Sequence, residues 1–508
     1  MASSVDFAGF SIAFALTYNF VTSMIVEPMT VSAKERIDQA RTAQTAWALL
    51  SLEARCRLLR SLRKVMEQQA DEIVRIISAE LAKPPMDALT GDLLVTLEHM
   101  LFYEKNAARI LKPRHRGKPA FLYRAARFTE VLEPHGVALI MAPWNYPLQL
   151  SMVPAVTALF AGNAVLLKCS EHAPRAAALI ADLCSQAGLP PGLVQVSCEA
   201  PSEAAALVSA KPDIIFFTGS SENGHAIAES AARHGIPLIL ELGGSDAALV
   251  FASCDLERTV NGVVYGSFAN AGQVCVGIKR IYVEQSIYAE FLSRFLERVS
   301  RLRLGNDLES DLGVARQPAR LETLVQDAVA RGAAVHGTFS PGEAIPPLVL
   351  TGVPPDSLIL QQEFFGPVVC VAPFLDQEEA LRLANASPFA LGASLWTGDS
   401  RQGRDLAVKI NAGTCAVNDV IRNVGNPCVA FGGNGRSGYG RYHGEVGLRT
   451  FSRIRSIMVA DKLRDPEPHW FPFSRSSYTR LRAIIALRHG SGNLFARCGQ
   501  FLRRLRGV

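Results

Sequence analysis

The stretch IIFFTGSSENGHAIAESAARHG, residues 214–235, decides the fold class of this 508-residue chain. Its first four residues form an apolar run typical of a buried strand, and Thr218-Gly219-Ser220 then lead into a helical pattern that begins at about Glu222. A strand that turns directly into a helix presents free backbone N–H groups and the helix dipole to a pyrophosphate. Plain connections have the same form, so this junction alone does not establish a phosphate site.

Similar apolar runs recur on both sides of this stretch, with helical segments between them. They are VALIMA (137–142), AVLLK (164–168), LVQV (193–196) and LILEL (238–242), then RIYVE (280–284), VVCVAPF (368–374) and TCAVN (414–418). This alternation predicts an α/β fold with a parallel sheet covered on both faces, of the nucleotide-binding type, and a second α/β region after it. Residues 31–112 show helical spacing of their apolar residues instead.

Composition excludes several classes of protein. Apolar residues make up 49% of the chain and charged residues 19%, so it is neither disordered nor collagen-like. The ten cysteines form no CxxC pair, which argues against a disulfide framework or a structural zinc site and favours a reducing compartment. The histidines form no HxxxH pattern, so no metal is expected.

The N-terminal segment, residues 1–30, contains an uncharged apolar run, FAGFSIAFALTYNFVTSMIV, at residues 7–26. Twenty residues are long enough to cross a bilayer as a helix. Three interpretations stay open: a membrane-spanning helix, a peripheral segment packed on the fold, and an extension upstream of the true start of translation.

The C-terminal tail, residues 461–508, holds most of the net positive charge. The whole chain carries +5, but residues 469–508 contain eight arginines and no acidic residue, so the rest is slightly acidic. Leucine, isoleucine and phenylalanine recur between these arginines at helical spacing, which predicts an amphipathic helix on an anionic membrane surface. No pattern indicates nucleic-acid binding. We therefore expect a cytoplasmic protein associated with a membrane.

Candidate chemistry is concentrated in two short motifs. Glu241-Leu-Gly-Gly244 ends one apolar run, and Gly272-Gln-Val-Cys275 follows later. A cysteine can act as a nucleophile in its thiolate form, and a carboxylate nearby can activate a water molecule. The GxGxxG sequence at residues 433–438 lacks the strand before it and the helix after it that a dinucleotide-binding loop requires.

Seven motifs in this order resemble the aldehyde dehydrogenase superfamily, and the resemblance extends over residues 35–460. The motifs are PWNYP (143–147), KCSE (168–171), FTGS (217–220), ELGG (241–244), GQVC (272–275), EFFGP (363–367) and FGGNGRSGYGRYHG (431–444). The C-terminal motifs look most like the class 3 branch, which acts on fatty and aromatic aldehydes.

The resemblance implies roles for three catalytic residues. Cys275 is expected to attack the aldehyde, forming a thiohemiacetal and then a thioester. The Asn145 side chain and the Cys275 backbone N–H are expected to hold the oxyanion. Glu241 is expected to be the general base that activates the hydrolytic water.

The resemblance also implies a binding site for NAD, with NADP kept open. Lys168 and Glu171 correspond to residues that contact the adenosine ribose, and a carboxylate there favours NAD over a 2′-phosphate. Gly219 and Ser220 are expected at the pyrophosphate, Glu363 at the nicotinamide ribose and Phe365 at the nicotinamide ring.

The sequence departs from the family pattern at three places. Ser245-Asp-Ala247 replaces Lys-Ser-Pro after the ELGG motif, Cys169 replaces a proline, and Ala430 replaces another proline. These departures concern cofactor fit and local rigidity more than the reacting atoms.

The predicted reaction is NAD(P)-dependent oxidation of a hydrophobic aldehyde (long-chain aliphatic, isoprenoid or aromatic) to its acid. Alternatives are a coenzyme-A-acylating or semialdehyde dehydrogenase, or an inactive membrane-bound scaffold on the same fold. A homodimer is expected from the resemblance. The predicted domains are a Rossmann-type NAD(P)-binding domain (31–113 and 137–240), a catalytic domain (241–430), a small bridging or oligomerisation sheet (114–136 and 431–460), and the two terminal segments.

Overall fold

The computed structural model describes residues 31–117, 126–316, 318–339, 345–460, 467 and 469–505. Its contacts divide the chain into two compact units. Unit 1 contains the described residues up to Lys112 together with Leu132–Arg453, and unit 2 contains the described residues of Pro113–Val131 and those from Ile454 onward. The predicted N-terminal segment, residues 1–30, lies outside the described residues.

Unit 1 contains a six-stranded sheet in the order β17-β7-β6-β3-β4-β5. Strands β3 to β7 run parallel, and β17 pairs antiparallel to β7. The strands are β3 (Val137–Met141), β4 (Ala164–Lys168), β5 (Val194–Ser197), β6 (Ile214–Thr218), β7 (Leu238–Glu241) and β17 (Gly438–Tyr439). Every residue of β3 and β4 is buried, which explains their unbroken apolar runs.

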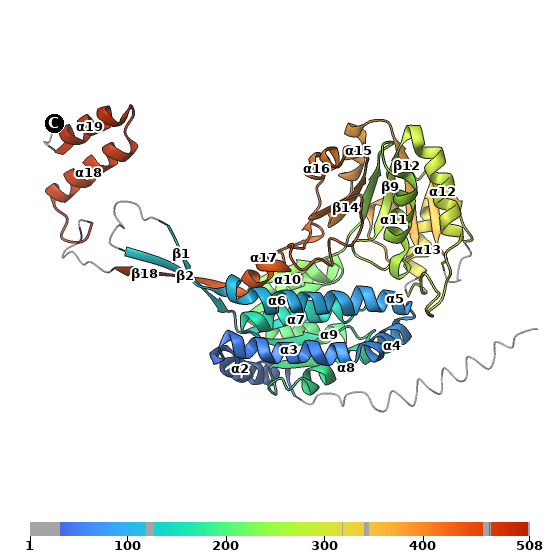
Figure 1. Ribbon diagram of the computed structural model, residues 1–508, viewed down its shortest axis with the longest axis horizontal. Coiled ribbons are helices and arrows are strands. Elements are labelled where there is room, and N and C mark those ends of the chain that lie inside the picture. The colour runs from blue at the N-terminus through green and yellow to red at the C-terminus, as the bar shows by residue number, and fades with distance from the viewer. Residues whose placement is uncertain are drawn as a thin grey trace, which may run out of the picture. The chain divides into compact units, whose positions relative to one another are not determined.

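The helices of this half of unit 1 cover both faces of the sheet (Figure 1). Helices α2 and α7 pack on β3 and β4, while α10 packs on β6 and β7. The helical segments are α2 (Ala33–Leu49), α3 (Leu52–Gln68), α4 (Ala70–Leu81), α5 (Pro85–Asp87), the π-helical η2 (Ala88–Leu94), α6 (Val95–Leu111), α7 (Gln149–Ala161), α8 (Pro174–Gln186), α9 (Pro201–Ser209), α10 (Ser221–His234) and α17 (Gly444–Thr450).

The strand order creates a crevice at one edge of this sheet. The chain builds β4 and β5 on one side of β3 and then crosses over to build β6 and β7 on the other side. In doubly wound sheets, ligands bind outside the carboxyl ends of the strands where the order reverses, here between β3 and β6. The motifs that follow β3, β4, β6 and β7 therefore converge on one place.

A second sheet in unit 1 has seven strands in the order β10-β11-β12-β9-β8-β14-β15. Only the edge pair β10 and β11 is antiparallel. The strands are β8 (Asp246–Val250), β9 (Ile278–Glu284), β10 (Ala334–His336), β11 (Leu348–Thr351), β12 (Val368–Phe374), β14 (Gly392–Trp396) and β15 (Thr414–Val417), and β13 (Phe389–Ala390) pairs separately with β16 (Asn434–Gly435). The two α/β regions predicted from the apolar runs are both present.

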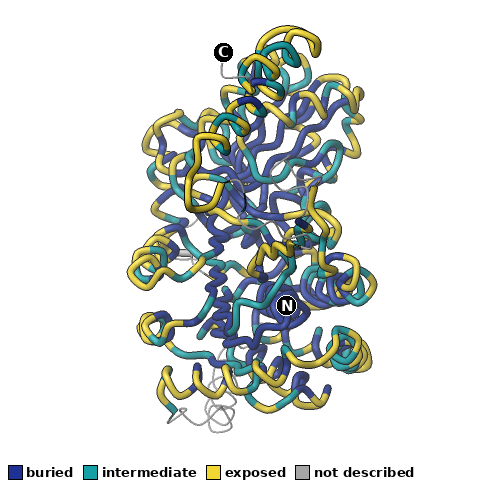
Figure 2. The backbone as a smooth tube through the Cα atoms, turned by 90° about the vertical axis from the view of Figure 1, so that its left-hand side faces the viewer, coloured by how far each residue is buried: buried dark blue, intermediate teal, exposed yellow. Residues whose placement is uncertain are grey.

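Helices also cover both faces of the second sheet (Figure 1). Ala248 and Val250 of β8 pack with α11 and α12 on one face, and Ala247 and Leu249 pack with α15 and α16 on the other. Figure 2 shows the interior of unit 1 buried and the outer turns exposed. The helical segments here are α11 (Leu256–Phe268), η4 (Ala269–Gly272), η5 (Gln285–Ile287), α12 (Tyr288–Ser300), α13 (Pro318–Ala330), α14 (Leu358–Gln361), α15 (Gln377–Ala384) and α16 (Ser400–Ala407).

Unit 2 contains most of a small sheet and a pair of C-terminal helices. The sheet has the order β1-β2-β18, with β1 (Arg114–His115), β2 (Ala126–Pro134) and β18 (Ser452–Ala460). The range predicted for the bridging element is wider than this sheet, because β16, β17 and α17 within residues 431–451 belong to unit 1. There β17 pairs with the strand that ends in Glu241.

The C-terminal helices are α18 (Arg475–His489) and α19 (Leu494–Leu505), which pack against each other. Ala483 and Ala486 of α18 are buried, whereas Leu494, Phe495 and Leu502 of α19 are exposed. Within the described part of the chain, no helix is long and apolar enough to cross a membrane.

Candidate active site

Cys275 follows a loop with an unusual backbone. Asn270, Ala271 and Gly272 have φ of 49°, 54° and 69°, in a region that residues with side chains rarely adopt. Several hydrogen bonds hold this loop. Among them, the Gln273 amide donates to the Asn270 carbonyl at 3.0 Å, and the Lys279 ammonium donates to the Gly272 carbonyl at 2.5 Å. The surrounding structure therefore determines a strained conformation directly before Cys275.

Asn145 lies in the loop after β3 and is buried. Its side-chain amide donates to the main-chain carbonyl of Gln273 at 2.9 Å, so the loop after β3 reaches the Cys275 loop. The Asn145 carbonyl accepts from the Lys83 ammonium at 2.8 Å and from the Asn270 amide at 3.1 Å. Asn145 is thus fixed through both its side chain and its main chain.

Glu241 is the last residue of β7 and is 3% exposed. Neither carboxylate oxygen has a hydrogen-bond partner among the described residues. Burial raises the pKa of this carboxyl well above its usual value, and the Arg441 guanidinium only partly opposes the shift. An unpartnered buried carboxyl is costly to a fold, which makes it a candidate for function.

The two glycines after Glu241 permit close approaches that a side chain would block. A Cβ on Gly243 would lie 2.0 Å from a carboxylate oxygen of Glu363, and a Cβ on Gly244 would lie 2.2 Å from the Cys275 carbonyl. The Gly244 N–H also donates to Glu363 Oε1 at 3.3 Å. The ELGG segment therefore brings Glu241, Cys275 and Glu363 into one site.

The surroundings of the Cys275 thiol favour its protonated form. Burial raises its pKa to about 12, and the carboxyl groups of Asp246, Glu241 and Glu363 contribute in the same direction. Burial also raises the pKa of Glu363 and of Asp246, each to about 7. Neutralisation of these carboxyl groups therefore favours formation of the thiolate.

The predicted adenosine-ribose residues form an ion pair at the end of β4. Lys168 Nζ lies 3.1 Å from Glu171 Oε2, with Lys168 nearly buried and Glu171 partly exposed. Burial opposes ionisation of Glu171, but its own backbone N–H and the Lys168 ammonium outweigh burial and hold its pKa below the usual value. Glu171 is therefore available as a charged acceptor.

A cavity of about 530 Å³ brings together all nine residues predicted for the site. Its wall includes Asn145, Lys168, Glu171, Gly219, Ser220, Glu241, Cys275, Glu363 and Phe365.

A dinucleotide fits the polar groups of this cavity. Ser220 caps the N-terminus of α10, where backbone N–H groups favour an anion, and the buried Thr218 hydroxyl has no partner among the described residues. Lys168 and Glu171 place a hydrogen-bond donor and an acceptor in the wall of the same cavity, as ribose hydroxyls would require. Within the described residues, no cluster of His, Cys, Asp and Glu is arranged to hold a metal ion.

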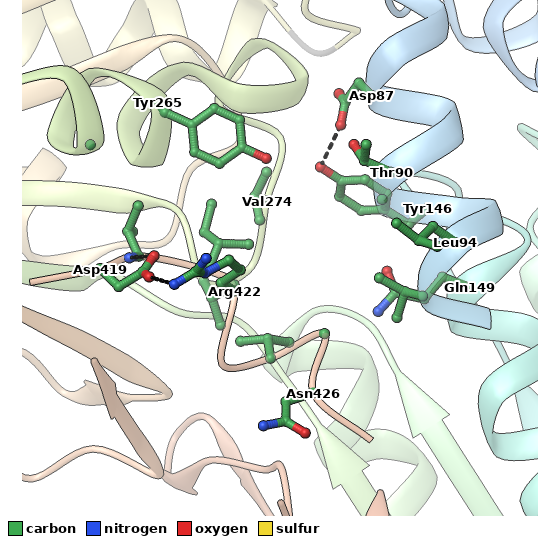
Figure 3. Close-up of a pocket in the computed structure, with 18 of the residues that line it drawn as sticks. Asp87, Thr90, Leu94, Tyr146, Gln149, Tyr265, Val274, Asp419, Arg422 and Asn426 are labelled. Atoms are coloured by element: carbon green, nitrogen blue, oxygen red, sulfur yellow. Dashed lines mark hydrogen bonds and ion pairs between the residues drawn. The ribbon is translucent and has the colours of Figure 1, made fainter. Parts of the chain in front are cut away.

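A second cavity of about 1060 Å³ also reaches Cys275. Figure 3 shows Asp87, Thr90 and Leu94 on one side of this cavity, facing Tyr265 and Val274 across it. Much of its wall is apolar: Leu94, Val95, Leu150, Tyr265, Val274, Val276, Trp396, Val420, Ile421, Val424, Phe431 and Tyr442.

Sequence reasoning missed several residues that shape the site. Lys83 and Arg441 come from segments with no recognised role for their charges, and Lys279 follows Cys275 by four residues. The sequence indicated Gln273 only as a member of the GQVC motif and gave it no role of its own. Lys83 lies between the end of α4 and Pro84, and nothing in this local sequence indicates a role for its charge.

Comparison with known proteins agrees with this geometry. Residues 25–457 match the model of the aldehyde dehydrogenase family. The chain is 38% identical over 468 residues to 4,4′-diapolycopene aldehyde oxidase of Methylomonas sp, covering 91% of this chain and 88% of that protein. It is 33% identical over 466 residues to a putative succinate-semialdehyde dehydrogenase [NADP(+)] 2 of Mycobacterium tuberculosis, covering 88% and 89%.

Solved structures give the same result. An NAD-dependent aldehyde dehydrogenase from Sinorhizobium meliloti has a TM-score of 0.81 at 29% identity, covering 86% of this chain and 88% of that one. PnpE in complex with nicotinamide adenine dinucleotide also has a TM-score of 0.81 at 29% identity, covering 85% and 91%.

The chain belongs to the aldehyde dehydrogenase family. It is an aldehyde-oxidising oxidoreductase with the aldehyde dehydrogenase fold, and NAD(P) is its cofactor. The predictions of family, fold class, enzyme class and cofactor are confirmed.

Proposed function

We propose that this enzyme oxidises a hydrophobic aldehyde to its carboxylic acid, with Cys275 as the nucleophile. The observation that carries the proposal is that Cys275 lines both cavities. The polar cavity has the groups that a dinucleotide requires, and the larger cavity has an apolar wall suited to a hydrocarbon chain. The thiol thus lies where an aldehyde carbon and a cofactor can meet.

The first chemical step joins Cys275 to the substrate. The thiol proton first passes to a carboxylate of the site. The thiolate sulfur then attacks the aldehyde carbon, the carbonyl π electrons move to oxygen, and a thiohemiacetal forms. The Asn145 amide and the Cys275 backbone N–H donate to the developing oxyanion; such preorganised donors contribute about 10²–10³-fold each. NAD(P), when bound among the polar groups of the smaller cavity, would supply the hydride acceptor that this oxidation of the thiohemiacetal to a thioester requires.

The second step releases the acid. Glu241 removes a proton from a water molecule, whose oxygen attacks the thioester carbon, and collapse of the tetrahedral adduct expels the Cys275 thiolate. A coenzyme-A-acylating enzyme transfers the acyl group to a thiol and needs no base for water. The buried, unpartnered Glu241 therefore supports hydrolysis to the free acid over that alternative and over an inactive scaffold.

Charge around the larger cavity supports a neutral substrate. Acidic lining residues outnumber cations: Asp87, Glu98, Asp255, Glu257 and Asp419 against Arg258 and Arg422. Arg422 is paired with Asp419, and Arg258 donates to the Asn418 carbonyl. A semialdehyde carboxylate would meet net negative charge here. Long-chain aliphatic, isoprenoid and aromatic aldehydes would not, so the Methylomonas oxidase is the better guide to substrate class.

The cofactor preference that we propose is NAD over NADP. The ionised Glu171 can accept hydrogen bonds from the ribose hydroxyls, whereas it would repel a 2′-phosphate. The adjacent Lys168 is already engaged with Glu171 at 3.1 Å, which limits its use as a phosphate ligand.

We also propose that the C-terminal helices bind an anionic membrane surface in the cytoplasm. In α19, Leu494, Phe495 and Leu502 form an exposed apolar face, and Arg503 and Arg504 add positive charge. Amphipathic basic helices bind anionic lipid through both contributions. A hydrophobic aldehyde dissolved in the bilayer would then reach the enzyme at high local concentration.

A homodimer through the small sheet is the proposed assembly. Strand β18 is an edge strand and is exposed at every residue after Ser452, including Ile454 and Met458. Edge strands pair readily with a second copy of the same strand. Light scattering of the full chain and of a Met458→Lys variant would test this assembly, and an unchanged dimer mass in the variant would contradict it.

The catalytic proposal is tested with a panel of aldehydes of increasing chain length, measured with NAD and with NADP, with and without lipid vesicles. We expect kcat/KM to rise with chain length, to be higher with NAD, and to be abolished in Cys275→Ala. Equal activity of Cys275→Ala would overturn the mechanism. A preference for semialdehydes would overturn the substrate class while leaving the mechanism standing.

A further inference from the structure

We propose that Lys83 and Asp92 are positioning residues that hold Asn145 in its working orientation. The inference rests on the role proposed above for Asn145 in binding the oxyanion. Neither residue lines either cavity, so any effect on the reaction must pass through the segment between them and the site.

Lys83 makes direct contact with the main chain of Asn145. Its side chain is 1% exposed, and its ammonium donates to the Asn145 carbonyl at 2.8 Å and lies 4.0 Å from the centroid of the Tyr146 ring. A buried ammonium over an aromatic face gains cation–π attraction and has one preferred place. Lys83 and Asn270 therefore hold the Asn145 carbonyl, while the Asn145 side chain bonds separately to Gln273.

Asp92 holds the other end of the same segment. One carboxylate oxygen lies 3.1 Å from Lys83 Nζ, and the other accepts from the backbone N–H groups of Leu148 and Gln149 at 3.0 Å and 3.3 Å. These N–H groups open α7, whose own N-terminal residue provides no side-chain cap. Asp92 thus caps α7 from another helix, where the dipole favours a carboxylate.

The pair consequently clamps residues 145–149 at two points. Tyr146 and Gln149, two residues of this segment, face the larger cavity (Figure 3). Tyr146 also donates to Asp87 at 3.3 Å, which adds a third attachment to the same helical region. Movement of the clamp would therefore move the Asn145 amide relative to Cys275.

Stability alone does not account for this pair. A buried ion pair gives up so much hydration that well-packed apolar or neutral replacements are often equally stable. The same pair also fixes geometry. Among the described residues, the hydrogen bonds of its two charged groups go to main-chain atoms of Asn145, Leu148 and Gln149 and to each other, and the ammonium lies over the Tyr146 ring.

The test compares Lys83→Met/Asp92→Asn, a neutral pair of similar shape, with Asn145→Ala and with the combined variant. A single Lys83→Met would leave Asp92 buried and unpaired, so the neutral pair is the informative one. Lys64→Met/Asp71→Asn, which changes the same residue types at exposed positions, is the matched control.

We expect the neutral pair to unfold near the temperature of the wild-type protein and to lose about 10- to 100-fold in kcat, because small displacements of catalytic groups have effects of this size. KM for aldehyde and cofactor should change little. In the Asn145→Ala background the same pair of substitutions should have little further effect, since the group that it positions is gone.

Three results would overturn the inference. They are a normal kcat in a folded neutral pair, an equal loss of kcat with and without Asn145, and an effect confined to KM. If Asn145→Ala itself keeps full activity, the role proposed for Asn145 fails first and this inference fails with it. If Asn145→Ala loses activity but the neutral pair keeps full activity, the positioning role of Lys83 and Asp92 is wrong, while the role proposed for Asn145 stands.

Discussion

The side-chain amide of Asn145 donates to the main-chain carbonyl of Gln273 at 2.9 Å, across 128 residues of sequence. This hydrogen bond joins the loop after β3, in the first sheet, to the strained loop that carries Cys275. A primary amide has two N–H groups, so one remains for an oxyanion after the other is used. In the mechanism proposed above, the same side chain would align the Cys275 loop and stabilise the transition state without reorganising during the reaction.

Glu241→Gln is expected to slow release of the acyl enzyme. The glutamine amide cannot take a proton from water, and loss of a general base costs about 10²–10⁴-fold. Rapid mixing with a good aldehyde should give a burst of NAD(P)H close to one per active site, then slow turnover. Glu229→Gln on the exposed face of α10 is the control, and normal steady-state turnover of Glu241→Gln would remove Glu241 from the mechanism.

The pH dependence of turnover follows from the buried position of Glu241. Its raised pKa means that the base form increases as pH rises, so the hydrolytic rate of the wild-type enzyme should increase with pH through and above neutrality. Glu241→Gln should lose this increase in the hydrolytic step. A rate that falls with increasing pH in the wild-type enzyme would contradict the assignment.

Asp246→Asn is expected to make Cys275 more acidic. After burial, the Asp246 carboxyl is the largest contributor to the raised pKa of the thiol, so removal of its charge lowers that pKa. Alkylation of Cys275, followed by mass spectrometry of its peptide, should become faster at neutral pH and shift to lower pH. Asp405→Asn, at an exposed position on α16, should leave the profile unchanged.

The same substitution has a predicted effect on stability. Burial raises the pKa of Asp246 from 3.8 to about 7, so the folded protein retains a proton that the unfolded chain releases. The corresponding stability is present below pH 3.8 and is lost as pH rises to about 7. Asp246→Asn should therefore raise the thermal midpoint more at pH 8 than at low pH. A pH-independent change would contradict this linkage.

The sequence predicts the sheets better than it predicts the supports of the site. Strands can be predicted from the apolar runs at residues 137–142 and 214–217 because strands buried on both faces carry unbroken apolar residues. The sequence also identifies Asn145, Glu241 and Cys275 as candidate site residues, because each belongs to a short motif. The roles of Lys83 and Asp92 cannot be read in this way. Besides each other, they bond to main-chain atoms more than fifty residues away, and no local spacing encodes a contact of that kind.

The boundaries of the small sheet are another feature that the sequence predicts less well than the strands of the larger sheets. The motif FGGNGRSGYGRYHG was predicted to belong to the bridging element, but Gly438 and Tyr439 extend the first sheet beside Glu241 and Leu240. The Ser437 hydroxyl donates to the Gly243 carbonyl at 2.6 Å, which adds a contact specific to this packing. Such pairing depends on the folded arrangement of distant strands, which the local pattern of glycines does not specify.

Leu94→Trp is expected to separate long from short substrates. Leu94 lines the larger cavity and is 49% exposed, so a larger side chain can be placed there without disturbing a core. KM for a long-chain aldehyde should rise about tenfold, a loss of 1.4 kcal/mol of binding, while a two- or three-carbon aldehyde should be little affected. Leu375→Trp, at an exposed position outside the cavity, is the control. Equal effects on both substrates would contradict the proposed path of the chain.

Deletion of residues 469–508 is expected to abolish binding to anionic vesicles while leaving oxidation of a short aldehyde unchanged. Each arginine near an anionic surface contributes about 1 kcal/mol, and the apolar face of α19 adds hydrophobic burial. Arg503→Gln/Arg504→Gln should therefore weaken binding to anionic vesicles and reduce its salt dependence, whereas Phe495→Ser/Leu502→Ser should weaken binding with little change in salt dependence. Arg401→Gln/Arg404→Gln on α16 makes the same change in charge in unit 1 and should have no effect. Co-sedimentation with vesicles of increasing anionic lipid content measures all four proteins, and binding that survives the deletion would show that the tail is not the membrane contact.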